Sequence, residues 1–192
     1  MRLFLSTMLV AFLLPTAAFA QAADKNIVYL DVPDSLKDTE VRIAKILLEK
    51  LKVNSSLQVR AGNEDDLILR ARFNANKEQN LPTILVIVDT RILNRTKDGK
   101  PISQIVSIAS FADVKANTDK RSELLEWANK LNSQTIPLRI YLANDRIVAA
   151  RNLFNSVSTP LSENAVASAF TSIVRAWVAL MADLKKNELI AP

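Results

Sequence analysis

The sequence predicts an α+β fold in which three helices pack on an antiparallel sheet of about five to six strands. Three observations predict it. Apolar residues recur at helical spacing in three separate stretches. Between them, alternating apolar and polar residues flank turn residues that are typical of β-hairpins. The elements run in the order α-β-β-β-β-α-β-β-α, and hairpins grouped in this way are typical of an α+β domain rather than of alternating βαβ units.

The first helix and the first hairpin follow each other closely. A helix is predicted from about Ser35 to Lys52, because Ser35 suits a helix start and apolar residues then recur at mainly helical spacing. The next stretch, SLQVRAGNEDDLILRARF, alternates apolar and polar residues on both sides of Gly62 and Asn63. It therefore predicts two strands joined by a somewhat long turn.

The second hairpin is the more apolar of the two. PTILVIVDTRILN and PISQIVSIASF flank Asp98 and Gly99, and this dipeptide is one of the strongest short hairpin signals. Because these two runs are more continuously apolar than the first pair, we expect them to be buried on both faces or to lie in the centre of the sheet.

The remaining elements are a helix, a hairpin and a long helix. An amphipathic pattern predicts a helix over residues 118–133. In PLRIYLANDRIVAARNLF, Asn144 and Asp145 supply residues that tolerate the left-handed conformation of a two-residue turn. Apolar residues at helical spacing then predict a helix of about five turns that follows Pro160 and Ser162.

The N-terminus reads as an export signal. Arg2 precedes an apolar run, and the small-residue pattern at Ala18 and Ala20 resembles a signal-peptidase site. We expect a signal peptide over Met1 to Ala20, an extended segment over residues 21–34 and a single domain over residues 35–192. The expected location is the periplasm of a Gram-negative bacterium, and secretion from the cell remains open.

Composition excludes several classes of function. The chain has no histidine and no cysteine, so a Ser-His-Asp triad, a Cys-His pair and nearly every zinc site are impossible. With two glycines it has no P-loop and no dinucleotide-binding motif. We therefore expect no enzymatic activity, no cofactor and no metal, although a hydrolase with paired carboxylates remains an alternative. Basic and acidic residues are interleaved, so a nucleic acid is not an expected partner.

Three arginines form the candidate binding site. Alternation in LILRARF places Arg70 and Arg72 on the face opposite Leu69, and Arg60 in the preceding strand should share that face. A solvated face balanced by the acidic cluster at residues 64–66 is the structural interpretation. In the functional interpretation, the guanidinium groups bind an acidic polypeptide segment or an anionic lipid headgroup.

Two further residue pairs have both a structural and a functional interpretation. Asn129 and Asn132 could end the second helix or hold the next strand, and the structural role of a helix terminator is favoured. Trp177 and Met181 could line a groove for a partner or lipid, but the apolar stripe around them favours core packing.

From Ile105 to Leu184 the chain resembles the YbjN domain family, whose fold is like that of the type III secretion chaperones. IVSIASF, ANKLNSQTI, PLRIYLANDRIVAARNLF and the long last helix carry the resemblance. The chain departs from the family at Leu131, where an aromatic residue is usual. The resemblance implies a chaperone-like or regulatory module that binds another polypeptide of the envelope and forms a homodimer. A carrier of lipid or another small apolar ligand is the alternative, and it would require an apolar cavity between the sheet and the last helix.

Overall fold

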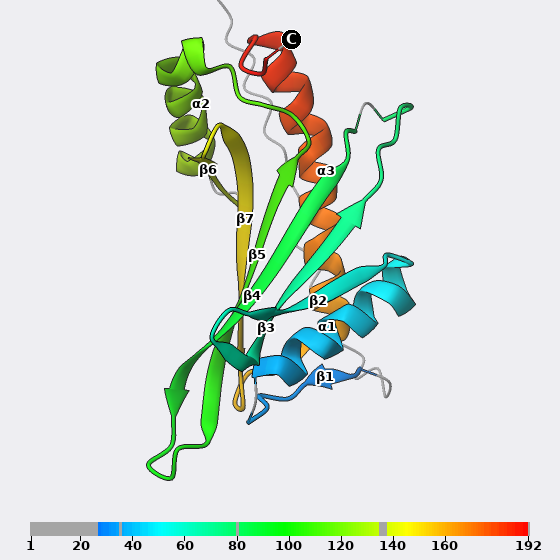
Figure 1. Cartoon of the computed structure of the whole chain (residues 1–192), viewed down its shortest axis with the longest axis vertical. Coiled ribbons are helices and arrows are strands. Elements are labelled where there is room, and N and C mark those ends of the chain that lie inside the picture. The colour runs from blue at the N-terminus through cyan, green and yellow to red at the C-terminus, as the bar shows by residue number, and fades with distance from the viewer. Residues whose placement is uncertain (1–26, 35, 80, 135–137, 192) are drawn as a thin grey trace, which may run out of the picture.

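The computed structural model describes residues 27–34, 36–79, 81–134 and 138–191. The expected signal peptide lies outside these residues. Within them, three helices accompany a six-stranded antiparallel sheet and a separate two-stranded sheet (Figure 1). The predicted α+β class is therefore confirmed.

The elements are these, in chain order: β1 Tyr29–Leu30, α1 Leu36–Leu51, β2 Ser55–Arg60, β3 Asn63–Phe73, β4 Ile84–Arg95, β5 Pro101–Ala112, η1 Thr118–Lys120, α2 Arg121–Ser133, β6 Arg139–Ala143, β7 Arg146–Ser156, β8 Leu161–Ser162 and α3 Glu163–Lys186. Every predicted helix and hairpin occurs in the predicted order. The sequence did not predict β1 and β8, which pair with each other as strands of two residues each. Such short strands contain too few residues to show a period of two.

The turn residues adopt the backbone conformations for which they were singled out. Gly62 and Gly99 have φ of 84° and 83°, and Asn144 and Asp145 have φ of 46° and 51°. Positive φ is readily accessible to glycine and is best tolerated, among the other residues, by asparagine and aspartate. Two consecutive positive values between β6 and β7 are what a tight hairpin turn requires.

The sheet has the strand order β2-β3-β4-β5-β7-β6, so β4 and β5 lie in its centre as expected. One face, here called the inner face, is covered by helices. On β4 it presents Ile84, Val86 and Val88, none of which is more than 1% exposed. They belong to one apolar core with side chains of α1 and α3, among them Ile43 and Phe170. In Figure 1, α1 and α2 lie toward opposite ends of the molecule.

The last helix, α3, is the central helix of the core. Ser162 caps its start by accepting a hydrogen bond from the backbone N–H of Ala165 at 3.1 Å. Its length and composition would also suit a membrane span. However, Trp177 and Met181 are buried, and the indole Nε1 of Trp177 donates a hydrogen bond to Ser110 Oγ at 2.9 Å. Trp177 and Met181 therefore pack in the core, as the favoured interpretation predicted.

The side chain of Asn132 bonds helix α2 to strand β6. The amide of Asn132 accepts a hydrogen bond from the backbone N–H of Ile140 and donates one to its carbonyl, both at 2.7 Å. A side chain that satisfies both backbone groups of one residue acts as an additional strand partner. Asn132 thus holds the next strand, whereas Asn129 is exposed on the helix surface. The favoured interpretation of this pair as a simple helix terminator was incomplete.

Candidate functional site

The face of the sheet that points away from the helices, here called the outer face, has an apolar centre. The strand register and alternation place Leu85 and Ile87 of β4 and Ile105 and Phe111 of β5 on this face. All four are partly exposed, and none belongs to the core. Antiparallel sheets that face water usually present polar residues there. An apolar centre on an open face therefore marks a candidate contact surface.

Arginines surround this centre. Arg146 lies over the ring of Phe111, with its guanidinium carbon 5.0 Å from the ring centroid. The register places Arg70 opposite Ile87 and Arg72 opposite Leu85, so both are neighbours of the apolar centre. Both are exposed. Among the side chains that the structure describes, no hydrogen bond or ion pair engages either guanidinium. Arg70 and Arg72 therefore have donors available to a partner.

Arg60 differs from the other two predicted arginines. Its guanidinium contacts two carboxylates on the outer face: Nε lies 2.7 Å from Oδ2 of Asp66, and Nη2 pairs with Asp89. Asp89 also lies 3.4 Å from Nε of Arg91. Asp66 therefore balances Arg60, as the structural interpretation expects, and Asp89 adds a second carboxylate, whereas neither carboxylate pairs with Arg70 or Arg72. The side chains of Glu64 and Asp65 lie outside the described residues.

A second polar group lies on the inner face, beneath α1. The Thr90 hydroxyl donates a hydrogen bond to Oε1 of Glu40, and the Thr39 hydroxyl donates one to Oε1 of Gln104 at 3.1 Å. All four side chains are buried, and Oε2 of Glu40 and Nε2 of Gln104 have no partner among the described residues. Two consecutive residues of α1 thus join it to the two central strands.

Burial raises the pKa of Glu40 from 4.5 to about 7. The hydrogen bond from Thr90 opposes this shift, while the charges of Asp66 and Asp89 add to it. Catalytic acids commonly have a carboxyl group whose pKa lies near neutrality. Glu40 is 0% exposed, however, so a substrate cannot reach it. The sequence contains a signal for this residue: Glu40, Ile43 and Leu47 have i, i+3, i+7 spacing, which places a carboxylate in an apolar stripe.

The alternative function suggested by the sequence was a hydrolase that uses paired carboxylates. Asp66 and Asp89 do lie near each other, but both are engaged by Arg60 on the open sheet face. Within the described part of the chain, no three acidic side chains gather closely enough to hold a metal ion.

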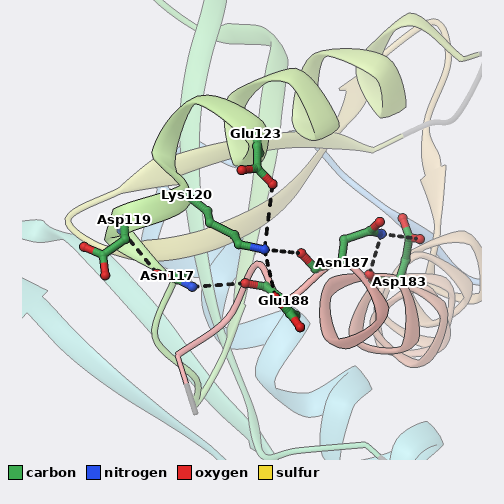
Figure 2. Close-up of polar contacts among 7 residues, drawn as sticks. All are labelled: Asn117, Asp119, Lys120, Glu123, Asp183, Asn187 and Glu188. Carbon is green, nitrogen blue, oxygen red and sulfur yellow. Dashed lines mark hydrogen bonds and ion pairs between the residues drawn. The ribbon is translucent and has the colours of Figure 1, made fainter.

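A third polar cluster holds the C-terminal residues and is shown in Figure 2. Nζ of Lys120 lies 3.0 Å from Oε2 of Glu188, 3.4 Å from the carbonyl oxygen of Asn187 and 3.9 Å from Glu123. This pairing raises the pKa of Lys120 and lowers that of Glu188. Asn117 adds a 3.1 Å hydrogen bond to the carbonyl of Glu188. These groups satisfy one another at the surface, so the cluster fastens the tail rather than offering a binding site.

Comparison with known proteins gives a distant likeness to solved structures. No family model matches the chain, and no curated protein sequence matches it either. Among solved structures, the chain is similar to YbjN from E. coli, with 12% identity and a TM-score of 0.48 over 85% of this chain and 99% of that one. A likeness at this level assigns neither a family nor a function. The function proposed below therefore rests on the side chains of this chain.

Proposed function

We propose that this protein is a non-enzymatic binding module that takes an acidic and partly apolar polypeptide segment on its outer sheet face. The observation that supports it is the apolar centre bordered by Arg70 and Arg72, two exposed guanidinium groups without partners among the described side chains. Apolar contact would hold the segment, and bidentate bonds to carboxylates would orient it.

Charge helps to select the partner. Arginines outnumber carboxylates at the described outer-face positions, with Arg60, Arg70, Arg72, Arg91, Arg139 and Arg146 against Asp66 and Asp89. Two copies of this chain meeting outer face to outer face would bring like charges together, which opposes association. An acidic partner has no such penalty. Since exposed ion pairs are worth only ~0.2–1 kcal/mol each, the complex should be weak and sensitive to salt.

The test uses the double variant Arg70→Glu and Arg72→Glu with a fluorescent peptide in which glutamate alternates with leucine. The wild-type protein should bind the peptide at low ionic strength, and the double variant should not. The matched control is Lys37→Glu with Lys45→Glu, which makes the same change of charge on exposed positions of α1. Equal loss of binding in both double variants would mean that the net charge of the protein, not the arginine surface, determines binding. Unchanged binding in the arginine variant would refute the proposal.

An anionic lipid headgroup is the other ligand that an arginine surface could take. Vesicles of phosphatidylglycerol separate the two ligands in the same experiment. Retention on the vesicles together with failure to bind the peptide would favour the lipid. Both arginines are exposed and have no partner among the described side chains, so each reversal should change the free energy of unfolding by no more than about 0.5 kcal/mol. The binding result can then be interpreted without a folding defect.

Export and self-association complete the proposal. The pattern of residues 1–20 supports a location in the periplasm or outside the cell. The resemblance found in the sequence also implies a homodimer. Light scattering over the micromolar range tests self-association. The mass of a single chain at every concentration would refute the homodimer.

A further inference from the structure

A small apolar cavity lies where helix α2, strand β6 and helix α3 meet. Its volume is about 240 Å³. One side is formed by Leu131 of α2, by Leu138, which precedes β6, and by Ile140 of β6. The other side is formed by Ala176, Ala179 and Leu180 of α3. The two alanines are the reason for the space, because larger residues at those positions would bring α3 into contact with α2 and β6. The cavity is separate from the outer face, since Ile140 points to the inner face of the sheet.

The volume limits what can enter. An apolar cavity of ~150 Å³ holds one benzene molecule, so this cavity suits a compact molecule of about ten non-hydrogen atoms. It is too small for the acyl chain of a membrane lipid. The sequence leaves a lipid or a small apolar molecule as possible ligands. Of these two, the small molecule fits this cavity and the lipid does not.

Among the described residues that line the cavity, Asp183 is the charged one. Its Oδ2 accepts a hydrogen bond from the indole Nε1 of Trp127 at 2.6 Å, and its Oδ1 accepts one from Nδ2 of Asn187 at 3.0 Å. Both donors are uncharged, and no cation pairs with this carboxylate among the described residues. Asp183 thus presents an uncompensated negative charge at the edge of an apolar space.

The adjoining groove, which Asp183 and Leu131 also line, carries charges of both signs. Its other charged groups are the carboxylates of Glu123 and Glu126 and the ammonium groups of Lys130 and Lys186, and Glu123 lies 3.9 Å from Lys120. The attraction for a cation at the cavity therefore comes from Asp183 itself.

We propose that this cavity binds a small apolar amine, with the apolar body between α2, β6 and α3 and the ammonium group beside Asp183. The carboxylate is already held in place by Trp127 and Asn187, so it needs no rearrangement to meet the ammonium group. This site is independent of the outer face, and either one can fail while the other stands.

The test compares three probes of similar shape that differ in charge: phenethylamine, phenethyl alcohol and phenylacetate. Calorimetry on the mature protein should show binding of the amine about fivefold tighter than of the alcohol, as expected for one partly exposed charge pair, and no binding of phenylacetate. The indole N–H resonance of Trp127 should shift with the amine, because that group bonds to Asp183. If none of the three probes binds at millimolar concentration, the proposal is wrong.

Three variants locate the site. Ala176→Leu should fill the cavity and abolish binding of both the amine and the alcohol. If this variant does not fold, Ala179→Leu serves the same purpose, because Ala179 is at an exposed position. Ala165→Leu, exposed elsewhere on α3, is the matched control and should bind as the wild type does. Asp183→Asn should remove the fivefold preference for the amine while keeping the alcohol. Binding that survives both cavity-filling substitutions would overturn the site, and a preference that survives Asp183→Asn would overturn the role of the charge.

Discussion

Glu40 and Thr90 join helix α1 to the central strand β4 through a hydrogen bond that is closed off from solvent, with the two residues 0% and 1% exposed. The bond runs from a hydroxyl to a carboxyl group whose second oxygen has no described partner. Burial favours the neutral form of such a group, because the charged form loses its hydration. The attachment of α1 should therefore depend on the proton that Glu40 carries.

The first prediction is that stability falls as pH rises through about 7. The folded protein raises the pKa of Glu40 from 4.5 to about 7, so it holds this proton more tightly than the unfolded chain does. The stabilisation that comes from the proton on Glu40 is complete below about pH 4.5 and is lost as the pH rises through about 7. At 1.36 kcal/mol for each pKa unit, the loss amounts to at most about 3 kcal/mol.

Urea unfolding at about pH 5 and about pH 8 measures this dependence. Glu40→Gln, which is neutral at every pH, should flatten it. Glu49→Gln, exposed on the same helix, is the control and should keep it. A Glu40→Gln variant that loses as much stability as the wild type over this pH range would mean that another group is responsible.

Removing the Asn132 side chain should destabilise the fold more than its small size suggests. Asn132→Ala deletes both hydrogen bonds to Ile140, and each such bond contributes about 1 kcal/mol, so we expect a loss of about 2 kcal/mol. Asn129→Ala, one turn earlier and exposed, should change stability little. Equal effects of the two substitutions in urea unfolding would contradict the role of Asn132.

Ser110→Ala should leave the buried indole N–H of Trp177 without an acceptor. Ser110 accepts from Trp177 at 2.9 Å and itself donates to the carbonyl of Ala149 at 2.7 Å. An unsatisfied buried donor costs about 1–3 kcal/mol. A double-mutant cycle with Trp177→Phe isolates the pair, and a coupling energy near zero would show that the bond contributes nothing to stability.

Leu189 should contribute more than the ion pair beside it to holding the C-terminal tail. Leu189 is 2% exposed and belongs to the core, so Leu189→Ala should cost about 2–5 kcal/mol. Glu188→Ala removes the partner of Lys120, which is fully exposed to solvent screening, and should have a small effect that vanishes in salt. The reverse order of the two effects in thermal unfolding would refute this account.

Mature protein recovered from cells should begin at Gln21, because residues 1–20 have the order of charged, apolar and small residues that signal peptidase recognises. Intact-mass spectrometry of the periplasmic fraction measures this directly. A folded protein that still carries Met1 to Ala20 would mean that the segment is an anchor, and the proposed location would then be wrong.

The sequence predicts the hairpins well because their turns depend on local chemistry. Gly62, Gly99 and the Asn144–Asp145 pair each lie where the backbone turns with positive φ, and that preference is a property of the residues themselves. Alternation likewise assigns Arg70 and Arg72 to a face without knowledge of neighbouring strands.

Contacts between distant segments were not predictable in the same way. Asp89 reaches Arg60 only because β3 lies between their strands in a particular register, and the register of β2 shifts at the residue before Arg60. The cavity beside Asp183 depends on the spacing of α2 from α3, which no local pattern encodes. Glu40 is an intermediate case, since its position in an apolar stripe is visible in the sequence but its partner Thr90 is not.

Helix α3 follows all six strands of the large sheet in the sequence, and this order affects how the protein folds. The inner faces of β4 and β5 are completed by Phe170 and Trp177, and the tail is secured by Leu189, all of which leave the ribosome after the whole sheet. An incomplete nascent chain therefore exposes the apolar side of its central strands and is prone to aggregate. Truncation anywhere before α3 should therefore yield insoluble material rather than a smaller folded unit.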